Sequence, residues 1–251
     1  MLYFIVLLAA ASSVSGAAPA EVVCQGTHYK HLQGIAADSE AIYWCFTRRL
    51  VKTDMAGKVL KTVEVRSHHG DLTCHDGKVY VAVNFGAFNE EPGKEDSWVY
   101  VYRASDLSFI SKHAVPELVH GAGGMAYHNG RFVVIGGLPR THEQNYVYEY
   151  DENFRFLKRH VLPSGYTVLG IQTACYADGL WWFGCYGGKM LKTDESFRLV
   201  GKYDCDVAVG IVKVAKDRFL IGRCFDESKR GRAFYARPDA KKGMVPAGPS
   251  K

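Results

Sequence analysis

The chain has 251 residues, of which 47% are hydrophobic, and carries a formal net charge of +5. Its basic residues are scattered rather than gathered in blocks, so we expect no nucleic-acid partner. Once a leader segment is set aside, about 230 residues are enough for one large all-β domain or two small ones.

The first residues have the composition of a secretory signal peptide. An uncharged apolar run extends from Leu2 to Ala11, and small residues lead to Ser-Gly-Ala at 15–17. The run is too short to span a bilayer, as is usual for a cleaved leader. We therefore predict a signal peptide over 1–17, a secreted or periplasmic protein, and no membrane insertion after cleavage.

One pattern recurs five times in the remaining chain. A polar turn is followed by about five β-branched or aromatic residues, as in "CHDGKVYVAVN" (74–84), and such turns favour tight hairpins. The turns fall at Asp38, Asp76, Asn129, Asp178 and Lys216. A second turn follows each of them, so each unit contains four strands. Four-stranded units of roughly 40–50 residues are typical of β-propeller blades.

The strand after the first turn is apolar on both faces. Val79 to Val83 leave no polar side for water. In a propeller, each sheet is covered by both neighbouring sheets, so its middle strands lose their alternation. We therefore predict an all-β fold, a five-bladed β-propeller of four-stranded antiparallel blades within 18–240. The blades are expected at about 31–66, 67–117, 118–163, 164–204 and 205–240.

Ring closure needs one more strand, because the last unit contains only three clear ones. We predict that 20–29, with the sequence "AEVVCQGTHY", supplies the outer strand of blade five. Residues 241–251 make a poor strand and are expected to form a flexible tail; the alternatives are that this tail supplies the outer strand, or that the ring stays open.

Seven cysteines follow the leader: Cys24, Cys45, Cys74, Cys175, Cys185, Cys205 and Cys224. Export permits disulfides, and the odd number leaves at least one thiol unpaired. The sequence does not determine the pairing.

Propeller geometry also predicts where a site lies. The connections between blades open on the same face as the loops between the second and third strands, which are long at 84–97, 136–145 and 223–232. Long polar loops on a rigid scaffold are where binding sites usually occur. Histidines from three blades, and one from a long loop, are expected near this mouth of the central channel: His31, His68, His69, His120 and His142.

Specific roles follow from the chemistry of these groups. For β-elimination from a uronic acid, His69 or His120 would act as base, Tyr166 as acid, and Arg140 or Arg223 would neutralise the carboxylate. The remaining candidates for binding substrate are Gln33, Asp71, Asn84, His142, Gln172 and Arg223.

The phrases "DGKVYVAVN" (76–84) and "KTDESFRLVGKYD" (192–204) resemble secreted propellers of the gluconolactonase-like (calcium-dependent phosphotriesterase-like) group. The resemblance extends over the chain after the leader and implies a site at the channel mouth, often with a divalent cation. That group usually has six blades, whereas five units are visible here.

Three functions remain open. The first is an exported lyase or hydrolase acting on a carbohydrate or another oxyanion-bearing small molecule. The second is a non-catalytic glycan- or protein-binding module that uses Phe85, Phe88, Tyr186 and the histidines. The third is a metal-dependent hydrolase of the lactonase type that binds Ca, Mn or Zn through His69, Asp71 or Asn84. We expect a monomer with a small-molecule or glycan ligand.

Overall fold

The computed structural model describes residues 20–28, 30–223 and 230–247. The signal peptide predicted for 1–17 lies outside the described residues, and so does Cys224. Across the described ranges the regular secondary structure consists of strands, and no helix there has the length and apolarity to cross a membrane.

Four blades are each built from four consecutive antiparallel strands, as predicted. Blade one contains β2 (Leu32–Ala37), β3 (Ala41–Phe46), β4 (Arg49–Asp54) and β5 (Val59–Glu64). Blade two contains β6 (His69–His75), β7 (Lys78–Asn84), β8 (Ser97–Arg103) and β9 (Phe109–Ala114). Blade three contains β10 (Ala122–His128), β11 (Arg131–Gly136), β12 (Asn145–Tyr150) and β13 (Phe156–Leu162). Blade four contains β14 (Val168–Ala177), β15 (Leu180–Tyr186), β16 (Lys189–Asp194) and β17 (Leu199–Asp204).

Blade five has a composite outer strand. Its inner strands are β18 (Ile211–Ala215), β19 (Arg218–Arg223) and β20 (Arg232–Asp239). The first half of β20 pairs with β1 (Glu21–Val23), which confirms that the N-terminal segment contributes to closure. The second half of β20 pairs with β21 (Gly243–Pro246). The expectation of a flexible tail is therefore wrong for these four residues, because the free edge of β20 gives them ladder hydrogen-bond partners.

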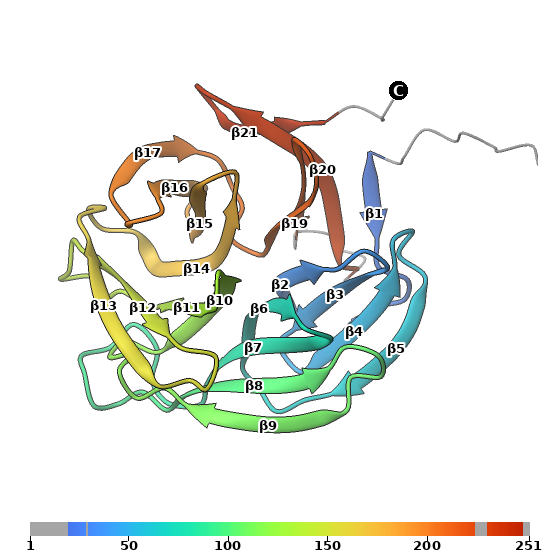
Figure 1. Cartoon of the computed structure of the whole chain (residues 1–251), viewed down its shortest axis with the longest axis horizontal. Helices are drawn as coiled ribbons and strands as arrows, with labels where there is room; N and C mark the ends of the chain where they lie inside the picture. Colours follow the sequence, from blue (N-terminus) through green and yellow to red (C-terminus); the bar gives the residue numbers. More distant parts are fainter. Residues whose placement is uncertain (1–19, 29, 224–229, 248–251) are drawn as a thin grey trace, which may run out of the picture.

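The five sheets form a closed ring (Figure 1). The first strand of each blade contacts that of the next, from β2 through β6, β10 and β14 to β18, and β18 returns to β2. The fold is thus a five-bladed β-propeller whose innermost strands line the central channel.

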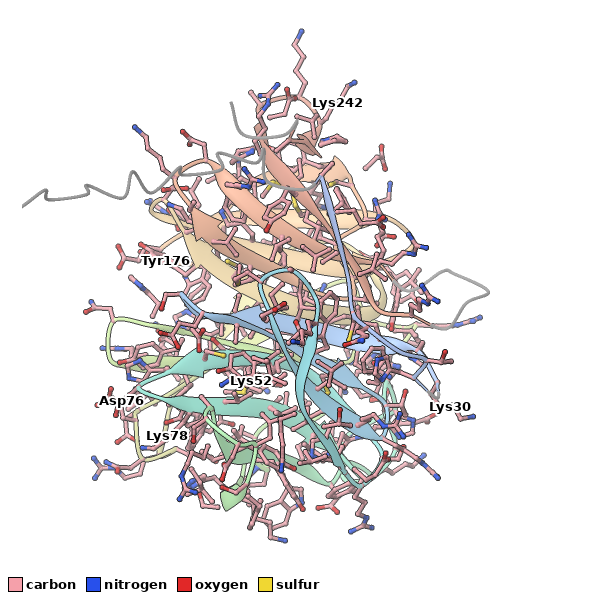
Figure 2. All side chains as sticks on the ribbon, turned by 90° about the vertical axis from the view of Figure 1, so that its right-hand side faces the viewer. Lys30, Lys52, Asp76, Lys78, Tyr176 and Lys242 are labelled. Atoms are coloured by element: carbon pink, nitrogen blue, oxygen red, sulfur yellow. The ribbon has the colours of Figure 1, made fainter. Side chains whose placement is uncertain are left out.

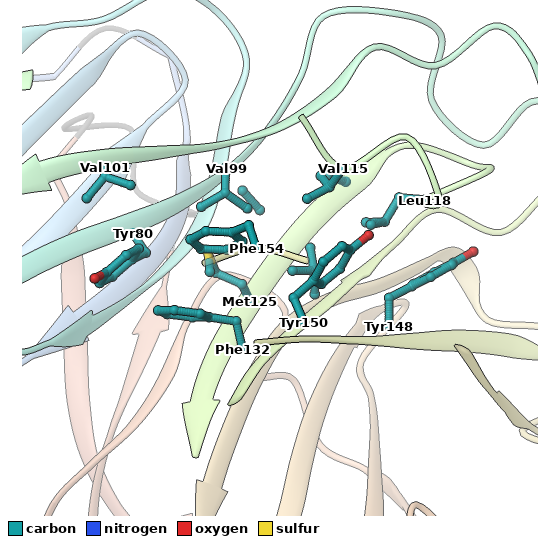
Figure 3. Close-up of a cluster of buried hydrophobic side chains, with 13 residues drawn as sticks. Tyr80, Val99, Val101, Val115, Leu118, Met125, Phe132, Tyr148, Tyr150 and Phe154 are labelled. Carbon is teal, nitrogen blue, oxygen red and sulfur yellow. The ribbon is translucent and has the colours of Figure 1, made fainter. Parts of the chain in front are cut away.

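Strand β7 shows why the repeated apolar run has no polar side. Val79, Val81 and Val83 pack into a cluster shared with blade one, where they meet Tyr43. Tyr80 and Ala82 point the other way, into a cluster with Phe132 of blade three (Figure 3). Alternate residues of one strand therefore fill two inter-blade cores, so the strand needs apolar residues throughout.

The two faces of the ring have different loops. Viewed from the edge, Lys30, just before β2, lies on one side, and Asp76 and Lys78 lie on the other (Figure 2). Asp76 and Gly77 both have positive φ, as required in the tight two-residue turn between β6 and β7. The tight turns lie on this face, and the long loops are on the opposite face.

The six described cysteines are all free thiols. Four of them are buried, and burial raises the pKa of Cys24 to about 12. These thiols therefore pack as small apolar groups within the blades.

Candidate functional site

The candidate site is a pocket of about 270 Å³ at the mouth of the central channel. It opens on the face with the long loops, as the blade geometry predicts. Residues from blades one to four line it: His31, Gln33, His68, His69, Gly70, Asn84, Gly86, Phe88, Ala122, Gly123, Leu169, Gln172 and Tyr186. Gln33, His69, Asn84 and Gln172 were among the predicted site residues.

Blade one contributes His31 and Gln33 from the start of β2. The Gln33 amide donates to His31 Nε2 at 2.8 Å and to Thr47 Oγ1 at 3.3 Å. His31 therefore accepts through Nε2 and carries its proton on Nδ1. Burial, then the neighbouring His68 and Lys30, lower the pKa of His31, so the ring is neutral at pH 7.

Blade two contributes His68 immediately before β6. Its side chain is exposed at the pocket, and its imidazole makes no hydrogen bond within the described part of the chain. His31 and His68 interact electrostatically. Two imidazoles from different blades thus share one pocket, and His68 has the freer nitrogens.

His69 lies next to His68 in sequence but is fully buried. Its Nδ1–H donates to the Arg66 carbonyl at 2.6 Å, and its Nε2 accepts from the Tyr102 hydroxyl at 2.7 Å. Burial lowers its pKa to about 4. Both ring nitrogens are hydrogen-bonded within the protein. His69 therefore stabilises the start of β6 and has no free nitrogen to accept a proton from a ligand.

Asn84 organises the long loop of blade two. Its amide nitrogen donates to the Gly86 and Ala87 carbonyls, both at 3.0 Å. Its Oδ1 accepts the Asp96 amide at 3.0 Å and the Ser97 hydroxyl at 3.4 Å. These bonds use the donors and acceptors of the side chain, and they fix the loop that carries Phe88 to the pocket wall.

Asp71 lies below the pocket at the centre of the channel and is only 1% exposed. Its Oδ2 accepts the Ala174 amide of blade four at 3.2 Å. Burial raises its pKa well above the usual value, and the amides of Leu72, Ala174 and Ile35 oppose that rise. Burial thus favours the uncharged form of Asp71, and its hydrogen bond to Ala174 links the inner strands of blades two and four.

The remaining walls are aromatic and amide groups. Gln172 donates to the Leu169 carbonyl, which holds its side chain over the mouth. Phe88 and Tyr186 provide ring surfaces from blades two and four. The sequence analysis did not predict Leu169 as a site residue. Leu169 has a positive φ at a bulge in β14, and the one feature of the sequence that indicates this bulge is the glycine that follows.

Besides Asp71, His120 and His142, three predicted residues do not line this pocket. Tyr166 is 41% exposed and lines a separate surface hollow together with Lys189. Arg223 pairs with Asp206 at 2.7 Å. Arg140 is exposed in the long loop of blade three. The arginine clamp and tyrosine acid predicted for elimination are therefore not brought to the mouth pocket with His69.

His120 and His142 form a second histidine pair outside the pocket lining. Their ring centroids are 5.0 Å apart, and His120 is buried while His142 is partly exposed. The structure thus separates the predicted histidines: His31, His68 and His69 line the mouth pocket, whereas His120 and His142 lie next to each other outside its lining.

The predicted metal ligands do not form a metal centre. Within the described ranges, no three His, Cys, Asp or Glu side chains gather closely enough to hold an ion. His69 and Asn84 are engaged in the hydrogen bonds given above, and Asp71 has a single carboxyl oxygen, Oδ1, without a partner among the described residues. A calcium-type site at the channel mouth does not fit these residues, since such a site needs several free oxygen ligands.

No family model and no curated protein matches the chain. Solved structures do match its fold. A glutaminyl cyclase from Myxococcus xanthus is 12% identical with a TM-score of 0.64, covering 86% of this chain and 92% of that one. A Bacteroides caccae protein of unknown function is 13% identical with a TM-score of 0.50, covering 80% and 81%. The WD40 repeats of RRP9 are 8% identical with a TM-score of 0.50, covering 85% and 96%. At these identities, the likeness shows the propeller fold alone.

Proposed function

We propose that the chain binds a small carbohydrate, or another oxyanion-bearing small molecule, in the mouth pocket. The observation that carries this proposal is the lining itself, in which three imidazoles and three carboxamides share the pocket with the rings of Phe88 and Tyr186. Ligand sites are typically concave and largely apolar, with a few polar groups that fix orientation.

The chemistry of the lining suits a sugar. A sugar ring has an apolar face and a rim of hydroxyl groups that both donate and accept hydrogen bonds. Aromatic rings can cover the face, and imidazole and amide groups can meet the hydroxyls. At roughly 30 Å³ per water molecule, the pocket holds about nine waters, which is room for one sugar unit. A longer glycan would extend over the long loops.

A second candidate is acid–base catalysis in the same pocket, by His31 and His68. It is favoured because His31 is neutral at pH 7 and His68 is unbonded, so a proton can be taken up and returned within one pocket. Hydrolysis by paired carboxylates is less supported, since no Asp or Glu is among the described lining residues. A lactonase-type hydrolase stays a prediction from sequence. We also propose that the protein acts outside the cytoplasm as a monomer.

Binding is tested by screening neutral and uronic-acid sugars by calorimetry with the chain that follows the leader. Phe88→Ala and His68→Ala are expected to weaken a bound sugar about tenfold or more, since each removes a wall of the pocket. His75→Ala, on the opposite face, is the control and is expected to bind normally. Failure of every sugar to bind, or equal loss in the control, would refute the proposal.

Catalysis is tested on any sugar that binds. Uronic-acid oligosaccharides are followed by the ultraviolet absorbance of an unsaturated product. Peptides with N-terminal glutamine are included because the Myxococcus xanthus protein of similar fold is a glutaminyl cyclase. If His31→Ala and His68→Ala abolish turnover even at sugar concentrations that saturate each variant, the pair is catalytic. Binding without turnover in the parent protein rejects the second candidate and keeps the first.

A further inference from the structure

A second hollow, of about 250 Å³, lies on blade four and is similar in size to the mouth pocket. At roughly 30 Å³ per water molecule it holds about eight waters, which is room for one sugar unit. We call it the blade-four hollow, and its walls include Tyr166, Thr167, Lys189, Lys202, Tyr203 and Asp204.

Two segments of the chain run from one hollow to the other. In the first, Tyr166 and Thr167 line the blade-four hollow, whereas Leu169 lines the mouth pocket. In the second, which joins β15 to β16, Lys189 lines the blade-four hollow and Tyr186 lines the mouth pocket. Each segment advances by three residues, which is at most about 10 Å at about 3.3 Å per residue. The two hollows are therefore neighbours on one face of the ring.

The surface between the hollows is exposed and apolar. Tyr166, Val168 and Leu169 are three exposed large hydrophobic residues within four positions, with exposed fractions of 41%, 43% and 40%. Val168 pairs with Tyr186 in the register of β14 and β15. Its side chain lies beside Gly187, which is also exposed, and a Cβ on Gly187 would be 3.4 Å from Val168 Cγ2. A ligand can therefore lie across Val168 and Gly187 and enter both hollows.

Hydrogen bonds hold the blade-four hollow in shape. The Asn145 amide donates to Ser164 Oγ at 2.7 Å and to Thr167 Oγ1 at 2.9 Å. The Lys202 ammonium donates to the Ser164 carbonyl. Asn145, Ser164 and Thr167 are all buried, so this part of the wall is rigid. A wall fixed by the protein itself lowers the entropic cost of binding a ligand.

The walls of the blade-four hollow carry groups that suit a sugar unit. Tyr166 presents an exposed aromatic ring, which can cover the apolar face of a sugar. Lys189 and Asp204 form an exposed ion pair, whose ammonium can donate to sugar hydroxyls and whose carboxylate can accept from them. Lys202 has two N–H donors beyond the one directed at Ser164.

We propose that the mouth pocket and the blade-four hollow are two subsites of one binding site for an oligosaccharide, which crosses Val168 between them. This inference rests on the proposed function, because the mouth pocket is the subsite for the first sugar unit. The long loops offer another route for a longer glycan, but the route along blade four leads to a hollow of matching size.

The test compares short and long sugars by calorimetry with the chain that follows the leader. Glucose is compared with cellotetraose, and galacturonic acid with its tetramer. The tetrasaccharide is expected to bind at least about tenfold more tightly than its monosaccharide, because units held in two subsites reinforce each other. Tyr166→Ala is expected to remove most of this gain and to leave binding of the monosaccharide unchanged. Tyr166→Phe, which keeps the ring, is expected to retain the gain.

Phe109→Ala is the control, because Phe109 is 56% exposed on β9 of blade two and lines neither hollow. It should change neither affinity, and the melting temperature of Tyr166→Ala should equal that of the parent. The inference is overturned if the tetrasaccharide binds no more tightly than the monosaccharide, or if Tyr166→Ala keeps the gain or weakens both sugars equally. Loss of the gain in Phe109→Ala would also overturn it. If no sugar of either length binds, the proposed function fails and the inference fails with it, whereas equal binding of both lengths refutes the second subsite alone.

Discussion

If the N-terminal strand closes the ring, substitution of Val22 should destabilise the protein. This side chain is 1% exposed and lies in the cluster that joins blade five to blade one, with Trp44 and Tyr235. Val22→Ala removes two carbon groups at about 0.8 kcal/mol each, and the cavity left behind brings the loss to about 2 kcal/mol. For a chain of this size, that lowers the melting temperature by about 4–8 °C.

Val23 is the matched control, because it is the same residue type on the same strand but faces outward and is only partly buried. Val23→Ala is expected to change the free energy of unfolding by no more than about 0.5 kcal/mol. Both variants are measured by urea unfolding, with the m-value checked for constancy. Equal effects of the two substitutions would show that β1 is not docked in blade five, and would refute the closure.

Three further predictions concern the centre of the ring. Burial lowers the pKa of His69 to about 4, so the unfolded chain alone takes up this proton as pH falls from 6.5. The free energy of unfolding is therefore about 3 kcal/mol lower at pH 4 than above pH 6.5. The His69→Gln variant should not show this decrease when both proteins are unfolded in urea. Burial raises the pKa of Asp71, so the contribution of this residue to the free energy of unfolding falls as pH rises above about 4. The fall is at most about 1.4 kcal/mol per pH unit. Asp71→Asn should gain stability relative to the parent between pH 4 and pH 7; a pH-independent difference would contradict this. Gly34→Ala places a Cβ 2.2 Å from Asp71 Oδ1 and 2.5 Å from Asp71 Cα, and should cost about 3 kcal/mol or more in thermal unfolding; a loss under about 0.5 kcal/mol would contradict the packing.

The fold could be predicted because the blade repeat is a local pattern. Asp76 with Gly77, and Asn129 with Gly130, have the positive φ values that such turns require. The apolar runs after them fill two cores at once. The composite outer strand of blade five was not predictable in full: "KKGMVPAGPSK" has little strand propensity, and β21 forms only because β1 covers just half of β20.

The candidate site was predictable in position but not in the roles of its residues. Repeat geometry brings residues at the blade starts together, so His31 and His68 share a pocket although they lie on different blades. The sequence does not show which of two adjacent histidines turns inward. His69 is the first residue of β6 and bonds to Tyr102, whereas His68 precedes the strand and faces the mouth. Arg140 and Tyr166 lie in connections whose path is not fixed by the repeat.

Asp71 also lies between the mouth pocket and the opposite end of the channel. Gln33, Gly70 and Gly123 line the pocket above it, and a separate hollow of about 130 Å³ lies below, lined by the next residues along the same strands. Gly34 leaves room for the carboxyl group where any Cβ would collide with it. Burial raises the pKa of this carboxyl group, which disfavours a negative charge under the ligand. A ligand of the mouth pocket is therefore expected to enter and leave by the face that carries the long loops, beside Phe88.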